Sequence, residues 1–448
     1  MPPTPTGLPQ VVISGLGYAG VHGYGRSCLE PALCGGEPPP TSEVDRPAGY
    51  HRRRGARRAC LADPAGMGPW VAPAEARRMS PLSRLAVAAA RMALEDAGLG
   101  SARGDGEAGR RGAAVPARGA RGQGDWIGDG GDCRRDTAVV VATGFGPSSF
   151  SEALLRQILG DGPESASPYL FTESVANAPA AQIAIACGAR GPSVTVCQRE
   201  SGALLAVARG AAEVAAGRAC RALVGVVDEI SPLVHALLDR FGALARGVPT
   251  VGGEPDGSEL ARPFDRRRDG VVAADGAAML VLERAADAVR RGARPLARVL
   301  AGGSAFDPTA PVTGWGAGHE RLGAALRRTL DRAGLEASGV ERIVSGGSGA
   351  RGGDRLEAAT LRAAWSGRPL PPVLVPKSVT GEYGGGFLAA AVLAAAGARF
   401  GPTAGFAEPD PALGLVPHDG RPLRAPATVL LSSLAAGGAA AWLVLAAP

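Results

Sequence analysis

The chain of 448 residues is 46% hydrophobic and carries a formal net charge of +6 at pH 7. This length allows roughly two to three domains, and the apolar content excludes a chain that is disordered throughout. Much of the positive charge lies in residues 51–58 and 101–135, in Gly-rich sequence without interleaved aromatic side chains, so we expect no nucleic acid partner.

Short apolar runs alternate with helical patterns along the chain. Strands are predicted at 10–16, 137–143, 193–197, 222–228 and 277–283, and again at 297–303, 342–346, 372–376, 427–433 and 440–446. Helices are predicted at 80–98, 151–160, 201–217, 319–334, 354–365 and 386–399. Alternation of this kind is typical of an α/β fold with buried sheets.

The predicted strands form two sets of five that divide near residue 285, which suggests an internal duplication. We therefore predict two halves, residues 1–285 and 286–448. Two segments interrupt the pattern, at 40–75 and at 100–135. The second is of low complexity and cannot bury enough apolar surface to offset the entropy of ordering it, so we predict a flexible surface insertion.

Cysteine spacing and the two termini bear on the cellular compartment. The seven cysteines show no CxxC pair and no nearby histidine cluster, which predicts reduced thiols and no metal site. The first ten residues lack the basic and apolar regions of a signal peptide, so a cytoplasmic protein is expected. Residues 426–448 carry no charge, but serines and glycines interrupt them, which favours two buried strands over a membrane span.

Several separated stretches, in the same order, resemble the β-ketoacyl synthases of the thiolase superfamily. "VVISGLG" at 11–17 is similar to their opening strand, and 79–99 is similar to their first long helix. "ARPFDRRRDGVVAADGAAMLVLE" at 261–283 is similar to their RPFD…RDG…EGAG…LVLE signature. The resemblance covers nearly the whole chain apart from 40–75 and 100–135. It implies a thiolase-like fold of five αβαβα layers, built from two duplicated halves.

The position of the family's nucleophilic cysteine holds a charged residue. Alignment on the Ser-Gly pair at 201–202 places Arg199 there, whereas counting from the Gly-Pro pair at 191–192 places Glu200 there. Cys197 comes two to three positions early, and we interpret it as the end of a strand. We interpret the oppositely charged pair Arg199 and Glu200 as side chains that fill a former active site, where Glu382 is a candidate partner for Arg199. The alternative is an exposed pair on a rearranged loop.

The family's two catalytic histidines and its gating phenylalanine are also replaced. The first histidine corresponds to Gly346 in "GGSGARGGD", and the second to Glu382 in "KSVTGE", where the family's Lys377 is retained. The gating phenylalanine corresponds to Ala436 in "AAGGAA". No catalytic position is therefore intact.

Such losses on a preserved scaffold resemble the ketosynthase-β subunit, or chain length factor, of type II polyketide synthases. The resemblance implies a non-condensing subunit of an acyltransferase family that forms a heterodimer with an active ketosynthase-α and is active only within that synthase. It implies substrates carried on a phosphopantetheinyl acyl carrier protein and no cofactor of its own. It also implies that the strand with Val194 and Val196 lies at the subunit interface.

In chain length factors, the helix after the "GFGP" turn closes the tunnel of the growing chain. The residues on one side of the corresponding helix here are Phe150, Ala153, Leu154, Gln157 and Ile158. Helical pattern alone explains Leu154 and Ile158 equally well as core residues.

Two other functions stay open from the sequence. One is an enzyme that uses this pocket for different chemistry, such as malonyl-carrier decarboxylation with Gln198, or cyclisation or dehydration of a tethered polyketide. The other is a purely structural binding module.

Overall fold

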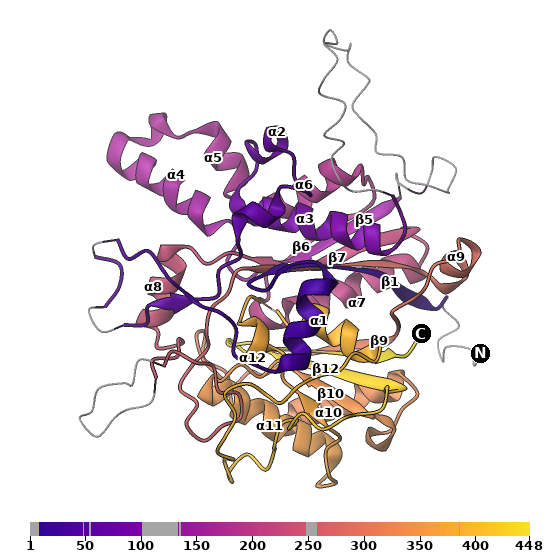
Figure 1. Cartoon of the computed structure of the whole chain (residues 1–448). Helices are drawn as coiled ribbons and strands as arrows, with labels where there is room; N and C mark the ends of the chain where they lie inside the picture. The colour runs from indigo at the N-terminus through magenta and orange to yellow at the C-terminus, as the bar shows by residue number, and fades with distance from the viewer. Residues whose placement is uncertain are drawn as a thin grey trace.

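The computed structural model of the chain describes residues 9–47, 49–52, 55–100, 133, 136–247, 258–384 and 386–448 (Figure 1). The predicted insertion at 100–135 lies almost entirely outside the described residues, so its flexibility stays a prediction. The strands are β1 (Val11–Gly20), β2 (Gly23–Tyr24), β3 (Ser42–Glu43), β4 (Arg58–Ala59), β5 (Thr137–Ala142), β6 (Ser193–Val196), β7 (Arg221–Asp228), β8 (Gly276–Arg284), β9 (Ala297–Phe306), β10 (Arg342–Ser345), β11 (Val373–Leu374), β12 (Thr428–Leu434) and β13 (Ala439–Ala446).

The sheet topology repeats itself. The strand order is β11-β10-β12-β13-β9-β1-β8-β7-β5-β6. From the centre outward, β1, β8, β7, β5 and β6 follow the same sequence of antiparallel and parallel pairings as β9, β13, β12, β10 and β11. The halves join where β1 pairs antiparallel with β9 through three residue pairs. This repeat confirms the predicted duplication.

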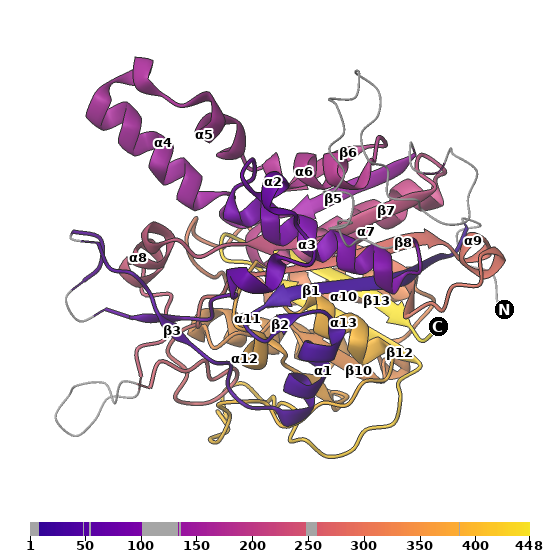
Figure 2. The same ribbon diagram turned by 45° about the horizontal axis from the view of Figure 1, so that its top comes forward.

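Helices cover both faces of the two sheet halves and fill the space between them (Figures 1 and 2). They are α1 (Arg26–Gly35), α2 (Pro73–Ala76), α3 (Pro81–Asp96), α4 (Ser148–Asp161), α5 (Pro168–Glu173), α6 (Ala178–Cys187), α7 (Gly202–Ala215), α8 (Pro232–Arg240), α9 (Ala285–Arg290), α10 (His319–Arg332), α11 (Arg351–Trp365), α12 (Lys377–Thr380) and α13 (Leu388–Ala395). Short 3-10 turns are η1 (Pro64–Met67), η3 (Pro163–Ser165), η4 (Arg199–Ser201) and η5 (Ala337–Gly339).

Three buried clusters define five layers. One joins α3 and α6 to the outer face of the N-terminal sheet half, and one joins α10 and α11 to the outer face of the C-terminal half. Between them, α7 and α13 pack against both sheet halves. The predicted αβαβα layering is therefore confirmed.

The first long helix lies directly on β1 because two glycines allow it. A Cβ atom on Gly15 would stand 2.2 Å from the Ala93 carbonyl oxygen, and one on Gly17 would stand 1.9 Å from that of Ala89. Any larger residue would push α3 off the sheet. Ser80 caps α3 by accepting a hydrogen bond from the Ser83 amide.

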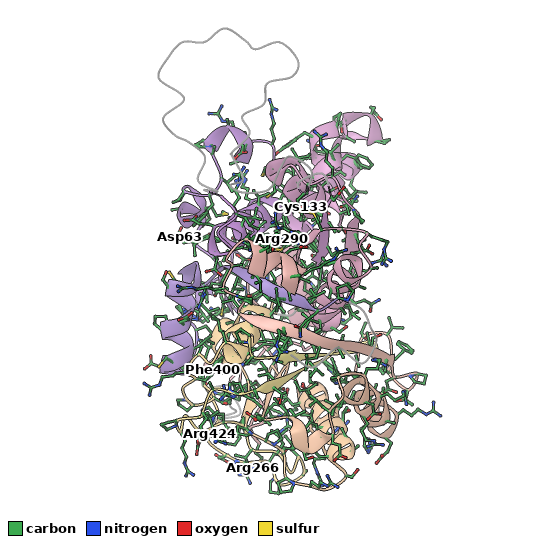
Figure 3. The ribbon with its side chains drawn as sticks, turned by 90° about the vertical axis from the view of Figure 1, so that its right-hand side faces the viewer. Asp63, Cys133, Arg266, Arg290, Phe400 and Arg424 are labelled. Atoms are coloured by element: carbon green, nitrogen blue, oxygen red, sulfur yellow. A yellow bond between two sulfur atoms is a disulfide. The ribbon has the colours of Figure 1, made fainter. Side chains whose placement is uncertain are left out.

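Part of the sequence before residue 285 packs with the C-terminal half. Arg266 forms an ion pair with Glu408 at 2.8 Å. In Figure 3 the labelled Arg266 lies low in the molecule with Phe400 and Arg424, whereas Asp63 and Cys133 lie high. The division of the halves at 285 stays a prediction.

The C-terminal apolar run forms the antiparallel strands β12 and β13, as predicted. Among the described residues, no helix is long and apolar enough to cross a membrane.

The prediction that all cysteines are reduced is wrong for one pair. Cys133 and Cys220 form a disulfide, with Cα atoms 6.0 Å apart. The register of the sheet brings them together, because Thr137 pairs with Arg221 where β5 and β7 begin. Sequence spacing could not show this proximity, since 87 residues separate the two cysteines.

Candidate functional site

A sharp turn after β6 carries the first of the predicted site residues. The exposed Cys197 and Gln198 lead from β6 into η4, and α7 follows at once. Arg199 has a φ of 46°, in the left-handed region that few residues other than glycine adopt. A strained residue between a strand and a helix is the geometry in which many enzymes present a nucleophile. Arg199 lies at the tip of this turn, and Glu200 follows it inside η4.

The carboxyl group of Glu200 lies inside the protein. Its side chain is 16% exposed, and its Oε1 lies 3.7 Å from the Arg199 guanidinium. Its Oε2 has no hydrogen-bond partner among the described residues. Burial raises the pKa of Glu200 above its usual range; the Arg199 charge opposes this rise and the Glu382 charge adds to it. The Ser433 hydroxyl donates to the Glu200 carbonyl oxygen at 2.6 Å, which fixes the turn against β12.

Glu382 is paired with the retained lysine rather than with Arg199, which corrects the expected partner. Lys377 Nζ lies 2.6 Å from Glu382 Oε2, and these side chains are 1% and 12% exposed. They are five positions apart in the sequence, and the loop after α12 turns back so that the two can meet. The Lys377 ammonium also lies 5.4 Å from the centre of the Phe387 ring. Two acid–base pairs, Arg199–Glu200 and Lys377–Glu382, therefore occupy the turn and the neighbouring loop.

Gly346, which we predicted to correspond to the first family histidine, has little room for a side chain. The Gly346 amide donates to the Ser432 carbonyl oxygen at 2.7 Å, and a Cβ on Gly346 would stand 3.0 Å from that oxygen and from Ser433 Oγ. Any side chain here would require β12 to shift by a few tenths of an ångström.

Two buried carboxyls organise the same loop; Asp354 ends the motif quoted above without a role having been given to it, and Glu357 was not singled out from the sequence. Asp354 accepts the amides of Phe264, Ser348 and Gly349 at 2.7, 3.1 and 3.3 Å. Burial raises the pKa of Asp354 to about 6 and that of Glu357 to about 7. Both lie on α11: Asp354 is the last residue of "GGSGARGGD" and Glu357 follows three positions later, and that proximity was the available signal.

Ala436, at the position of the family's gate, is half-buried in the turn between β12 and β13. The turn is held by its neighbours: the Gly437 amide donates to the Gly314 carbonyl at 2.8 Å, and the Gly438 amide to that of Ala435 at 3.1 Å. The side chain of Ala436 is a single methyl group, so no aromatic ring stands at this position.

The turn before α4 is fixed by two acidic residues at the end of β7. Asp228 accepts the Thr143 hydroxyl and the Gly144 amide, both at 2.8 Å. Glu229 accepts the amide and the hydroxyl of Ser149 at 2.8 and 2.7 Å, in the first turn of α4. A carboxylate at a helix N-terminus interacts favourably with the helix dipole. Sequence reasoning missed both acids, although the strand "ALVGVVD" ends on one of them.

The five residues predicted to line a tunnel lie on the side of α4 nearer the body of the protein. Leu154 is buried, and Phe150, Ala153, Gln157 and Ile158 are half-buried. Phe150 meets Tyr169 of α5 edge to face, with ring centroids 5.5 Å apart. Gln157 Oε1 accepts the Ser167 amide at 3.1 Å.

Several large apolar side chains that the sequence analysis did not single out are exposed on α4, α5 and α6. The most exposed are Leu155 (53%), Leu159 (84%), Phe171 (60%) and Ile185 (68%). Strand β6 ends the sheet and pairs with β5 alone among the described strands, with Val194 and Val196 half-buried. Exposed apolar side chains and an unpaired strand edge are features typical of protein–protein contact sites.

Comparison with known proteins gives a consistent result. The family defined by the β-ketoacyl synthase N-terminal domain matches residues 10–288. The tetracenomycin polyketide synthase ketoacyl synthase α subunit of Streptomyces glaucescens is 31% identical over 98% of this chain and 97% of its own. The corresponding β subunit is 32% identical over 67% of this chain and 72% of its own.

Other relatives agree. The actinorhodin polyketide β-ketoacyl synthase 2 of Streptomyces coelicolor is 35% identical, but the match spans only 59% of its length and 56% of this chain. Among solved structures, the ishigamide ketosynthase/chain length factor superposes with a TM-score of 0.81 at 27% identity, over 98% of this chain and 100% of the other. A ketosynthase in complex with its type II acyl-carrier protein shares the fold at 20% identity, with a TM-score of 0.79, over 98% and 100% of the two chains.

Proposed function

Because this chain belongs to the β-ketoacyl synthase family and its relatives are type II polyketide synthase subunits, we propose that it is the non-condensing partner of such a pair. The observation that carries the proposal is the content of the turn after β6. Condensation needs a thiolate there to take the acyl chain, and arginine has no nucleophilic atom at neutral pH. At the two histidine positions stand Gly346, which has no side chain, and Glu382, which is held by Lys377.

The partner is a ketosynthase that has its cysteine and both histidines. The exposed apolar side chains of α4, α5 and α6 and the open edge of β6 support a contact with a chain of the same fold. An open edge strand pairs readily with another strand. The relatives that come as α and β subunits support a heterodimer, and the neighbour solved with its acyl-carrier protein supports that carrier as the source of substrate. No cofactor is required for this role.

Within the pair, α4 is proposed to limit the length of the growing chain. Packed interiors have no spare room, so the volume of the side chains at the end of a tunnel sets how many carbons fit. The residues proposed for this role are Phe150, Ala153, Leu154, Gln157 and Ile158.

The experiment compares the chain alone with the chain co-expressed with a cysteine-containing ketosynthase. Alone, it should take no covalent label from a labelled acyl carrier protein, whereas the pair should elute one-to-one and make product. Label on Cys197 that disappears in Cys197→Ala would contradict the proposal, as would turnover of malonyl carrier protein by the chain alone. In the pair, Phe150→Ala should lengthen the product and Ala153→Trp should shorten it, as read by mass spectrometry of the carrier-bound chains.

A further inference from the structure

Helix α4 projects from the body together with α5 (Figure 2). Along its fourteen residues, only Ser148 and Leu154 are buried. Glu229 fixes its first turn, α5 packs against the same end through Phe150 and Tyr169, and Gln157 nearer the far end accepts the Ser167 amide. A segment from the region 40–75, which the sequence left without a function, reaches the middle of the helix.

The contact is made by Tyr50. Its hydroxyl donates to Glu152 Oε1 and accepts from the Arg156 guanidinium, one turn further along α4. Arg156 also bonds Glu152 at 3.0 Å and lies 5.3 Å from the centre of the Tyr50 ring. One aromatic side chain therefore holds two charged residues of α4, where a hydrogen bond to an ionised group is stronger than one between neutral groups.

Residues 49–52, which we call the strap, are fixed to the end of α8. Arg240 donates to the carbonyl oxygens of Gly49 and Tyr50 at 2.9 and 2.8 Å, and Arg52 donates to the Arg240 carbonyl at 2.6 Å. Three hydrogen bonds in total, at Gly49, Tyr50 and Arg52, thereby hold the strap to α8.

A histidine pair adds a buried attachment. His51 Nε2 and His235 Nδ1 are 3.0 Å apart, and His235 is fully buried on α8. Nε2 of His235 faces the Arg58 carbonyl oxygen at 3.2 Å, so this nitrogen carries the proton and Nδ1 accepts from His51. The strap thus rests on a rigid part of the core, while Tyr50 extends to α4.

We propose that Tyr50 is a positioning residue for α4. Because the strap is bonded to α8, the hydrogen bonds of Tyr50 hold the second and third turns of α4 at a fixed distance from α8. Tyr50 thereby sets the position of α4 against the partner subunit and the growing chain. The part that concerns the growing chain rests on the function proposed above. The part that concerns the helix does not, and it can be tested on this chain by itself.

The first test is hydrogen–deuterium exchange of peptides from α4 in the full chain. Tyr50→Phe removes both hydrogen bonds and keeps the ring, and α4 amides should exchange at least about tenfold faster, the factor expected when even one hydrogen bond to a charged group is lost. Arg240→Met removes two strap bonds and leaves the Tyr50 phenol in place, and it should act in the same direction. The matched control is Tyr24→Phe, which removes a phenol hydrogen bond of 2.6 Å to the Asp63 carbonyl elsewhere in the chain. If α4 exchanges equally in Tyr50→Phe and Tyr24→Phe, the proposal is overturned.

The second test uses the reconstituted pair and reads product length. Tyr50→Phe should broaden the length distribution, and Glu152→Gln, which keeps an acceptor for the phenol, should broaden it less. A distribution unchanged by Tyr50→Phe, while Phe150→Ala shifts it, would refute control of length by Tyr50. If Phe150→Ala also leaves product length unchanged, the proposed function of α4 fails, and the exchange result still decides whether Tyr50 positions the helix.

Discussion

The buried pair Lys377–Glu382 should be far more costly to break than to replace. At 2.6 Å and an effective dielectric constant of 20, the attraction of two unit charges is about 6 kcal/mol, and the loss of water around the charges offsets part of it. Lys377→Met keeps the length of the side chain but leaves Glu382 beside the Glu200 carboxyl with no positive partner. We expect the free energy of unfolding to fall by about 3–5 kcal/mol, measured by urea denaturation at pH 8.

The double variant Lys377→Met/Glu382→Leu removes both charges and should recover most of the loss, because an apolar pair can substitute for a buried ion pair. The control is Arg421→Met, which breaks a pair at 3.0 Å whose side chains are 86% and 55% exposed, and which should cost less than about 1 kcal/mol. If Lys377→Met lowers the free energy of unfolding no more than Arg421→Met, or if the double variant loses as much as Lys377→Met, then Glu382 does not need a positive partner in this site.

Three further predictions concern other parts of the molecule. Val196→Asp in the edge strand β6 should dissociate the complex with the ketosynthase, as read by size-exclusion chromatography. The control Val289→Asp, at a position 74% exposed on α9, should leave the complex intact. Co-elution of the Val196→Asp variant with the ketosynthase would show that β6 does not lie at the interface. Burial raises the pKa of Glu357 from 4.5 to about 7, so the folded state keeps a proton that the unfolded state releases. The wild type should therefore lose up to about 3 kcal/mol relative to Glu357→Gln as pH rises from 4.5 to 7, and parallel stability curves would refute this. Alkylation without reductant should leave Cys133 and Cys220 as a linked peptide, and modification of both would reject the disulfide.

The strands were predictable because their signal is local. Each of the ten predicted runs is a mostly apolar stretch that contributes to the sheet, and several are rich in β-branched residues. The helices that the sequence missed, such as α5 and α8, are short and begin with Pro after Ser. Their stability comes from caps and tertiary contacts, which periodicity does not report.

The sequence predicted which residue types occupy the site, but not which of them make contact. The resemblance placed charged residues at 199, 200 and 382 and a glycine at 346, but it could not show which charges meet. Lys377 reaches Glu382 because the chain turns back after α12, and that path depends on long-range packing. The carboxyls of Asp354 and Glu357 are buried by amides and hydroxyls from other elements, so no local pattern distinguishes them from surface acids.

The left-handed backbone of Arg199 has a consequence for engineering. A non-glycine residue in this conformation carries strain of about 1 kcal/mol or more, and arginine gains no chemistry from it. If Arg199 rather than Glu200 stands at the nucleophile position, as in one of the two alignments, a thiol introduced by Arg199→Cys should be presented to the site without remodelling the backbone. At Gly346, in contrast, the backbone does not readily accept a side chain, because a Cβ atom there would lie 3.0 Å from the Ser432 carbonyl oxygen and from Ser433 Oγ of β12. Converting this scaffold into a condensing one would therefore require β12 to yield by a few tenths of an ångström at Gly346, whereas the turn at Arg199 needs no such adjustment.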